Sequence, residues 1–339
     1  MVDLKAIYLT TLTRCAPEAL VRPHVDESMP RNVVAIGKCA GALLDGVASV
    51  VKIERAFVAI PEGYKLPRTK AEVHVGGHPH MTRASFDAGR ALLQFVDRFN
   101  DILFLISGGG SACVEVPLAP LTEDDVAREN ARLIASGMTI HDINKGRREL
   151  SAIKGGRLGE RVKGRAVTLV YSDVGTGRAD DVASGPVRGG TVIADNGTLV
   201  RTAASLVDGA TIIDEQLECD VEEAARLLAK TEGRLIVAGG EPTVAVRGDG
   251  RGGRCSELAV RFAMLSTAEA LFGSSDGVDG NSGAAGIYLP PRKELGGGPE
   301  WQAALHRSDT MPLATQVGEP IMIAPTGNNL RDLFLVARD

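Results

Sequence analysis

Short apolar runs alternate along the chain with segments whose apolar residues recur at helical spacing. The apolar runs are typical of strands buried on both faces of a parallel sheet, and they lie at residues 32–36, 55–60, 71–75, 101–106 and 167–171. The helical spacing predicts helices at residues 3–21, 83–99, 123–136 and 140–153. Because strands and helices alternate, we predict an α/β fold with mainly parallel or mixed sheets.

The second half of the chain continues this alternation with different polar clusters. Its predicted strands and helix lie at residues 235–238, 270–272 and 256–265. A chain of 339 residues is too long for one ordinary core, and its least patterned stretch is residues 195–220. We therefore predict two domains, at residues 1–205 and 206–339. The polar clusters follow strands, so we expect them to face one another across a cleft between the domains.

Composition narrows the class of protein. Hydrophobic residues make up 44% of the chain and charged residues 24%, as in soluble globular proteins. The net charge of −5 argues against a general binder of nucleic acid or membrane surfaces. Five cysteines without a Cys-x-x-Cys pair favour a reducing compartment over disulfides or a zinc site. No signal peptide is evident and no apolar stretch approaches the ~20 residues that span a bilayer, so we predict a cytoplasmic protein.

One apolar run ends abruptly in Gly108, Gly109, Gly110 and Ser111. Only glycine lets consecutive backbone N–H groups close around an oxyanion, so this turn predicts an anion site, with a simple packing turn as the alternative. It is not a Walker A loop, which needs Gly-x4-Gly-Lys-Ser/Thr. The dinucleotide fingerprint Gly-x-Gly-x-x-Gly fails at Cys113, so hydride transfer with NAD is poorly supported.

Three charged residues stand at the ends of predicted strands or loops. Lys38 begins a helix, where the helix dipole disfavours a cation unless an anion binds there. Asp173 ends a strand and fits a general base or a Mg²⁺ ligand, or else a residue that caps the next turn. Arg254 ends a glycine-rich loop and fits a contact to phosphoryl oxygens. The histidines at 74–80 lack a carboxylate ligand set, so we expect a strand-and-turn role for them.

Further polar residues leave two interpretations open. Within a basic stretch, Arg147 and Lys154 are candidates to bind a carboxylate or a phosphate. Asp276 and Asp279 could hold a metal or ribose hydroxyls, or simply form two Asp-Gly turns, and Glu241 is equally ambiguous. One group of oxyanion-binding residues and one of acidic residues with an arginine together favour phosphoryl transfer.

With these residues in place, the chain resembles the glycerate 2-kinase family of the MOFRL type, formerly labelled hydroxypyruvate reductase-like. The matching motifs are Ala35–Ala40, Gly77–Pro79, Ile106–Ala112, Ile143–Leu158, Ser172–Val174, Ala183–Pro186, Gly239–Val244, Gly252–Arg254, Ser275–Gly280 and Pro325–Asn329. The resemblance implies a Rossmann-like N-terminal domain and a smaller MOFRL-type C-terminal domain, with the active site in the cleft between them.

The resemblance also implies ATP- and Mg²⁺-dependent phosphorylation of the 2-hydroxyl of D-glycerate. Lys38, Asp173 and Arg254 match the family's catalytic trio, with Asp173 orienting or deprotonating the hydroxyl or holding Mg²⁺. The residues expected to contact the substrate or phosphate are Gly108, Gly109, Gly110, Ser111, Arg147, Lys154 and Glu241. Those expected to contact the nucleotide are Asp276, Asp279 and Asn328.

The chain also departs from the family pattern, beginning with its shorter length. Thr176-Gly177 replaces a Gly-Asp pair, Cys255-Ser256-Glu257 replaces Asn-Gln-Glu, and Ser282-Gly283 replaces Thr-Asp. These changes leave open a kinase for a related small hydroxy acid or polyol, or a nucleotide-binding relative that has lost catalysis. A hydroxypyruvate reductase ranks last because the dinucleotide fingerprint is missing. We expect a small hydroxy acid as partner, no nucleic acid or membrane, and leave a homodimer open.

Overall fold

The chain, in a computed structural model that describes residues 2–175 and 177–338, divides into two compact units. The first unit is Pro17–Asp195, and the second unit combines Met1–Ala16 with Asn196–Asp339. Thr176, where the chain departs from the family pattern, lies outside the described residues. Within the described ranges, no helix combines the length and the apolar character needed to cross a membrane.

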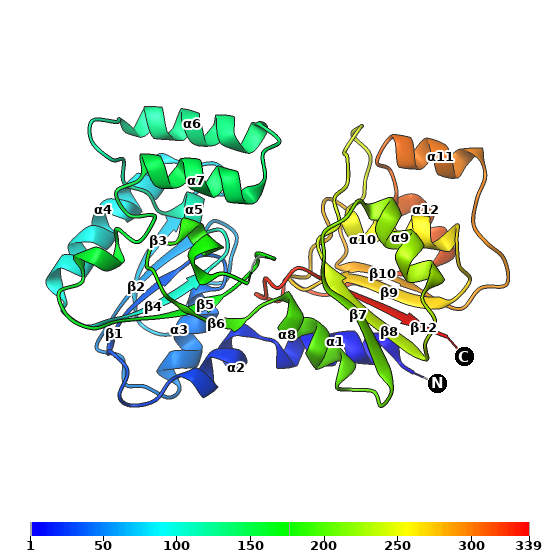
Figure 1. Cartoon of the computed structure of the whole chain (residues 1–339), viewed down its shortest axis with the longest axis horizontal. Coiled ribbons are helices and arrows are strands. Elements are labelled where there is room, and N and C mark those ends of the chain that lie inside the picture. The colour runs from blue at the N-terminus through cyan, green and yellow to red at the C-terminus, as the bar shows by residue number, and fades with distance from the viewer. Residues whose placement is uncertain (1, 176, 339) are drawn as a thin grey trace. The chain divides into compact units, whose positions relative to one another are not determined.

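The first unit is built on a six-stranded parallel sheet (Figure 1). Its strands are β1 (Asn32–Ile36), β2 (Arg55–Pro61), β3 (Glu72–Gly76), β4 (Ile102–Ser107), β5 (Ala166–Tyr171) and β6 (Thr191–Ala194). Their order is β3-β2-β1-β4-β5-β6, and every neighbouring pair is parallel. This order is that of a Rossmann fold, so the predicted α/β class is confirmed. The order reverses between β1 and β4, and ligands of such sheets bind beyond the carboxyl ends of the strands at this point.

Helices complete the first unit. They are α2 (Pro17–Val21), α3 (Ala40–Ala48), α4 (Arg83–Arg98), α5 (Gly110–Cys113), α6 (Glu123–Ala135) and α7 (Ile140–Leu150). Apolar residues of α4, such as Leu92 and Phe95, pack with Val34, Phe57 and Phe104 of the sheet in one buried core. Helices α6 and α7 lie side by side, as Figure 1 shows.

The second unit is built on a mixed six-stranded sheet in the order β11-β10-β9-β12-β8-β7. Its strands are β7 (Ala210–Leu217), β8 (Leu235–Gly240), β9 (Glu269–Ser274), β10 (Gly286–Leu289), β11 (Glu319–Pro320) and β12 (Asp332–Ala337). Strand β12 runs antiparallel to both of its neighbours, so its first residue, Asp332, pairs with Gly240 at the end of β8 and with Ser274 at the end of β9. One edge of the sheet therefore collects two strand ends and one strand start.

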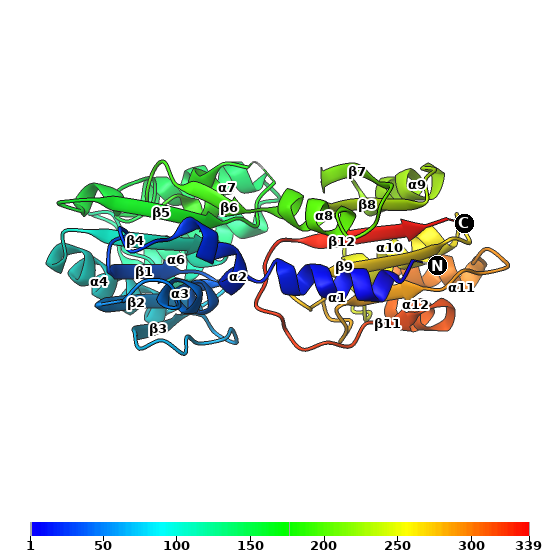
Figure 2. The same ribbon diagram turned by 90° about the horizontal axis from the view of Figure 1, so that it is seen from below.

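The helices of the second unit come from both ends of the chain. They are α1 (Leu4–Arg14), α8 (Asn196–Ala204), α9 (Val221–Lys230), α10 (Arg254–Ala263), α11 (Pro299–His306) and α12 (Met311–Val317). Figure 2 shows α1 beside α8, and α1 also contacts β9 and β12. The buried hydroxyl of Tyr8 on α1 donates a hydrogen bond to the carbonyl oxygen of Ser274 (2.6 Å), which fixes the helix to the end of β9.

Two sequence expectations differ from this arrangement. The single helix predicted at 3–21 is interrupted, because Pro17 disfavours helical geometry at the residue before it and then begins α2. The division between the compact units falls at Asn196 and not at residue 206, since α8 packs on β7 and β8. The stretch expected to lack pattern holds α8 and β7, and most residues of β7 are only half-buried, so no continuous apolar run marks this strand.

Candidate functional site

The candidate site of the first unit lies where β1 and β4 end side by side. The chain continues from β1 into Gly37 and Lys38, and from β4 into Gly108. The backbone N–H of Lys38 donates to the carbonyl oxygen of Gly108 (2.8 Å), and that of Cys39 donates to the hydroxyl of Ser107 (3.0 Å). Backbone hydrogen bonds therefore join the two loops at the switch point of the sheet.

Two glycines let charged side chains approach this loop closely. A Cβ atom on Gly108 would lie 1.7 Å from Oδ2 of Asp173, which follows the neighbouring strand β5. Gly109 has a φ of +82°, and a Cβ atom there would lie 2.9 Å from Cγ of Lys38. The structure thus places Lys38 and Asp173, two members of the predicted trio, against consecutive glycines.

The rest of the glycine loop has packing and hydrogen-bonding partners of its own. A Cβ atom on Gly110 would lie 2.7 Å from Cβ of Ala183, so this glycine fits the packing alternative. The hydroxyl of Ser111 shares a hydrogen bond with that of Ser184 (2.8 Å), which in turn donates to Oδ1 of Asn144. These contacts order the loop, and contact of either residue with a substrate stays a prediction.

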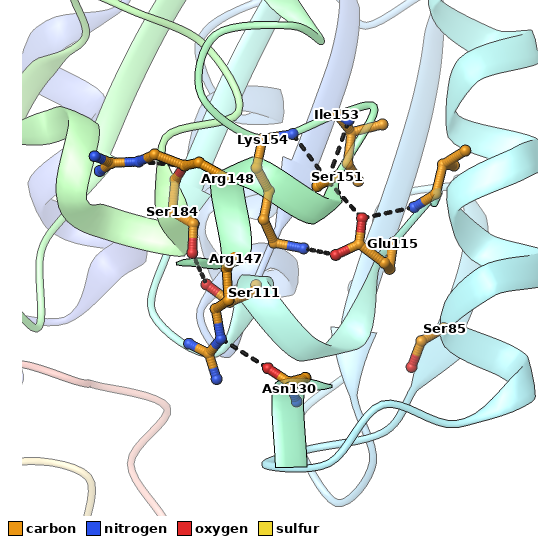
Figure 3. Close-up of polar contacts among 12 residues, drawn as sticks. Ser85, Ser111, Glu115, Asn130, Arg147, Arg148, Ser151, Ile153, Lys154 and Ser184 are labelled. Carbon is orange, nitrogen blue, oxygen red and sulfur yellow. Dashed lines mark hydrogen bonds and ion pairs between the residues drawn. The ribbon is translucent and has the colours of Figure 1, made fainter. Parts of the chain in front are cut away.

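Arg147 and Lys154 lie near each other but in different surroundings (Figure 3). Lys154 is 1% exposed and forms an ion pair with the buried carboxylate of Glu115, which also accepts a hydrogen bond from the Ser151 hydroxyl. Burial lowers the pKa of Lys154. Its ammonium is therefore held by a carboxylate of the protein, and its contact with a ligand stays a prediction. Arg147 is 9% exposed, and its Nε donates to Oδ1 of Asn130 (2.8 Å).

His78 joins this group, although no catalytic or binding role was predicted for it. A Cβ atom on Gly109 would lie 3.4 Å from Cδ2 of His78 as well as close to Lys38. Desolvation, followed by the positive charges of Lys38 and Arg147, lowers the pKa of His78 to about 4. The imidazole is therefore neutral at physiological pH. The Gly77–Pro79 motif was the only signal in the sequence that pointed to it.

In the second unit, Arg254 is the first residue of α10. Its Nε donates to Oδ2 of Asp332 (3.0 Å) and its Nη1 pairs with Oε1 of Glu241 (2.9 Å). Asp332 is fully buried, and its negative charge is the main cause that raises the pKa of Arg254. Asp332 was not predicted from the sequence, where it precedes the apolar run 333–337 as a single acidic residue.

The three residues predicted to contact the nucleotide have structural partners within the second unit. The carboxylate of Asp279 accepts hydrogen bonds from the backbone N–H groups of Cys255 and Ser256 (2.9 Å each), so it caps α10. Asp276 accepts from the backbone N–H of Val278, as in the Asp-Gly turn alternative. Asn328 donates to the carbonyl oxygen of Leu12 (3.0 Å). Their role in nucleotide binding stays a prediction.

Burial and the capping hydrogen bonds shift the pKa of Asp279 in opposite directions. Burial, with the nearby negative charge of Asp332 in addition, raises the pKa of this carboxyl to about 6, although the two backbone hydrogen bonds act to lower it. The first turn of α10, which carries Arg254, therefore rests on a carboxylate whose pKa lies above its usual value of 3.8. Asp279 and Arg254 thus form one structural group at this end of the sheet.

A divalent cation would find only part of its ligands in this protein. Across the described ranges, no three His, Cys, Asp or Glu side chains are arranged to hold a metal ion. Mg²⁺ in phosphoryl-transfer sites is commonly bound by one or two carboxylates together with the phosphates and water. The half-buried carboxylate of Asp173, beside the glycine loop, fits such a role as a single protein ligand.

Comparison with known proteins places these features in a family. Residues 3–218 match the model described as "Domain of unknown function (DUF4147)", and residues 234–332 match the MOFRL family. The D-glycerate 2-kinase of Thermotoga maritima is 28% identical, over 98% of this chain and 95% of that protein. The glycerate 2-kinase of Pyrococcus horikoshii is 26% identical, over 89% of this chain and 86% of that protein.

A solved structure agrees with the sequence relatives. The crystal structure of a glycerate kinase from Thermotoga maritima matches with a TM-score of 0.86 at 27% identity, covering 98% of this chain and 97% of the other. The likeness includes both units of the chain. The fold described above is therefore shared with that crystal structure.

Proposed function

Because the chain belongs to the DUF4147 family and carries the MOFRL domain found in glycerate 2-kinases, we propose that it phosphorylates the 2-hydroxyl of D-glycerate. It would thus be a small-molecule kinase acting on an alcohol group, with ATP as donor and Mg²⁺ as cofactor. The observation that carries the proposal is the pairing of Lys38 and Asp173 with Gly109 and Gly108 at the switch point of the sheet. A cation, a carboxylate and an open glycine loop are the groups that phosphoryl transfer needs.

The first unit supplies two of the proposed catalytic side chains. The Lys38 ammonium neutralises charge on the transferring phosphoryl group, as a compact point charge. The Asp173 carboxylate orients the acceptor hydroxyl and accepts its proton. In the alternative role, the Asp173 carboxylate would hold Mg²⁺, which would supply positive charge to offset that of the phosphates. Gly108 and Gly109 leave room for both side chains because neither carries a Cβ atom.

Arg254 completes the proposed trio from the second unit. Asp332 and Glu241 hold its guanidinium in one orientation through Nε and Nη1. A guanidinium has five N–H donors, so donors on both Nη atoms remain for phosphoryl oxygens. Asp332 and Glu241 act here as positioning residues.

A panel of acceptors tests the proposal. The purified full chain is incubated with ATP, Mg²⁺ and D-glycerate, L-glycerate, D-lactate, glycolate or glycerol, and the products are identified by ³¹P NMR. We expect ADP and 2-phosphoglycerate from D-glycerate. Turnover of another acid or of glycerol, but not of D-glycerate, would overturn the choice of substrate. Nucleotide binding without ADP from any acceptor would identify a relative that has lost catalysis.

A further inference from the structure

A buried arginine of the first unit has no carboxylate bound to it. Arg147, on α7, is 9% exposed, and its Nε donates to the neutral amide oxygen of Asn130. In the part of the chain that the structure describes, neither Nη atom of Arg147 has a hydrogen-bond or ion-pair partner. Figure 3 shows both terminal nitrogens pointing away from Asn130. The side chain is largely buried, yet its Nη atoms are not among the fully buried atoms without a partner, so they stay accessible to a ligand. Burying a cation without an ionic partner is costly, so its retention needs a reason.

The nearest acidic side chain cannot neutralise Arg147. The Glu115 carboxylate forms its ion pair with Lys154, and it also accepts hydrogen bonds from the Ser151 hydroxyl and the backbone N–H of Val116. Two buried cations, Arg147 and Lys154, therefore share one carboxylate, and the cluster carries one excess positive charge. Burial lowers the pKa of Arg147, as expected for a cation short of compensation.

The excess positive charge of this cluster lies near the glycine loop. His78 lies beside Gly109 together with Lys38. Arg147 lies on the same helix as Asn144, whose amide oxygen is joined through the Ser184 hydroxyl to Ser111 of the glycine loop, and Figure 3 shows Arg147 in this group. Desolvation, followed by the positive charges of Lys38 and Arg147, lowers the pKa of His78. Since His78 is itself neutral, Lys38 and Arg147 are the two cations that an acidic substrate would meet there.

We propose that the two Nη atoms of Arg147 bind the carboxylate of the hydroxy-acid substrate, while Lys38 and the glycine loop hold the transferring phosphoryl group. The inference rests on the proposed function. It assigns the substrate carboxylate to Arg147 and the phosphoryl group to Lys38 within the same site. A guanidinium presents a planar pair of donors that matches a carboxylate. A neutral acceptor such as a polyol would leave the buried cation unpaired. Arg147 therefore selects acids over polyols.

An isosteric pair of acceptors tests the assignment. D-glycerate and its amide, D-glyceramide, share the acceptor hydroxyl, but only the acid carries a carboxylate. We expect Arg147→Met to raise KM for D-glycerate at least ~100-fold, with kcat changed less than about tenfold and the slow turnover of the amide unchanged. Arg147→Lys keeps the charge without the planar donor pair, and we expect an intermediate KM. Arg128→Met, an exposed arginine on α6, is the control and should match wild type.

Equal losses for the acid and the amide in Arg147→Met would overturn the inference, because a structural role would not distinguish them. Stability gives a second readout. Replacing an unpaired buried cation by an apolar side chain should leave the Tm of the ligand-free protein within a few degrees. A large drop in that Tm would show that Arg147 supports the fold, and would overturn the inference too.

Calorimetry separates this inference from the proposed function. D-glycerate is titrated into wild type, Arg147→Met, Arg147→Lys and Arg128→Met, each with and without a non-hydrolysable ATP analogue. We expect binding to wild type and to Arg128→Met, weaker binding to Arg147→Lys and none to Arg147→Met. If no acceptor is phosphorylated but this pattern holds, the proposed function fails and the carboxylate site stands. If the wild type binds no D-glycerate, or if all four proteins bind it equally, the inference fails.

Discussion

The polar edges of the two sheets have opposite electrostatic character. At the first unit's edge, desolvation and the positive charges of Lys38 and Arg147 lower the pKa of His78 to about 4, and Arg147 has a neutral amide oxygen as its partner. At the second unit's edge, carboxylates predominate: burial and the charge of Asp332 raise the pKa of Asp279 to about 6, and Asp332 also raises that of Arg254. Each edge therefore shifts the pKa of one titratable group toward its neutral form, which is that of His78 at the first edge and that of Asp279 at the second.

This difference indicates what each edge can bind. At the first edge, the two Nη atoms of Arg147 have no partner among the described residues, so this edge can bind an anion directly. At the second edge the cation already has two carboxylate partners, of which Asp332 is fully buried and Glu241 is 41% exposed. Because Glu241 is partly solvated, its ion pair with Arg254 is the weaker of the two, and in the proposed mechanism the remaining Nη donors of Arg254 contact the phosphate. Asp332 would keep its contact with Arg254 throughout.

At both edges a glycine lies directly against an aspartate carboxylate. Gly108 lies against the carboxylate of Asp173, and Gly253 lies against that of Asp279, where a Cβ atom would come within 2.2 Å of Oδ1. Asp173 is half-buried beside the glycine loop, whereas Asp279 is 3% exposed and caps α10. The same close approach of glycine and aspartate thus occurs at the proposed catalytic aspartate in one unit and at a helix terminus in the other.

The largest expected effect comes from removing the cation of each edge. We expect Lys38→Ala and Arg254→Ala each to lower kcat at least ~100-fold. Each variant lacks a cation that is proposed to neutralise charge on the transferring phosphoryl group. Only Arg254→Ala should also lose stability, by about 3 kcal/mol, since Asp332 is then buried without its cation. Steady-state kinetics and urea denaturation measure the two effects.

A double variant separates these effects at the second edge. Arg254→Met with Asp332→Asn removes the cation and the buried charge together, so most of the stability should return while kcat stays low. Wild-type kcat in this double variant would remove Arg254 from the mechanism. A Lys38→Ala protein that is as destabilised as Arg254→Ala would show that the two edges do not differ in the way described.

The sequence predicted the first edge far better than the second. In a parallel sheet every strand ends at the same edge, so recognising the apolar runs of β1, β4 and β5 was enough to bring Lys38, Gly108 and Asp173 together. In the mixed sheet, β12 runs the other way, and its first residue, Asp332, reaches the ends of β8 and β9. No local pattern reveals that reversal.

Burial of charged residues was equally hard to predict. Lys154, in a basic stretch beside two glycines, has the pattern of an exposed ligand-binding residue. Its partner Glu115 lies 39 residues earlier in the chain, and only the folded unit brings the pair together. Likewise, α1 begins the chain but packs on β9 and β12 near its other end. Such contacts depend on tertiary structure, which hydrophobic periodicity does not reveal.

Alanine substitutions at the paired glycines should have an intermediate effect that differs between the edges. Gly108→Ala displaces the Asp173 carboxylate, so we expect kcat to fall about tenfold to a hundredfold with little change in stability. Gly253→Ala displaces Asp279 from the start of α10, so we expect a loss of about 1–2 kcal/mol, typical of a lost helix cap, besides lower activity. Kinetics and urea denaturation are compared for both variants.

Gly63 provides a control glycine at which an added Cβ atom has no close neighbour. Its φ is +85°, whereas Gly108 and Gly253 lie outside the positive-φ region, and a Cβ atom on Gly63 would meet no group within 4 Å. Gly63→Ala should therefore show only the strain of a positive φ, about 1 kcal/mol, with unchanged kcat. If Gly108→Ala behaved like Gly63→Ala, the close approach to Asp173 would have no bearing on activity.

The smallest expected effect is an opposite response of the two units to acid. His78 has a folded-state pKa near 4, below the usual 6.5, so the unfolded chain binds more protons between these values, and acidification weakens the first unit. Asp279 has a folded-state pKa near 6, above the usual 3.8, so the folded chain binds more protons there, and acidification strengthens the second unit. From pH 6 to pH 5 each change amounts to about 1 kcal/mol or less, and the exposed His78 contributes the smaller share.

Amide hydrogen exchange in β4 and in β8, converted to opening free energies at pH 6 and pH 5, measures the two units separately. We expect protection to fall in β4 and to rise in β8 on acidification. His78→Gln should abolish the first response and Asp279→Asn the second, because each variant removes the proton-binding group while keeping hydrogen-bonding capacity. If the opening free energies of both strands change with the same sign and neither variant alters their pH dependence, the claim that the two edges differ in electrostatic character is wrong.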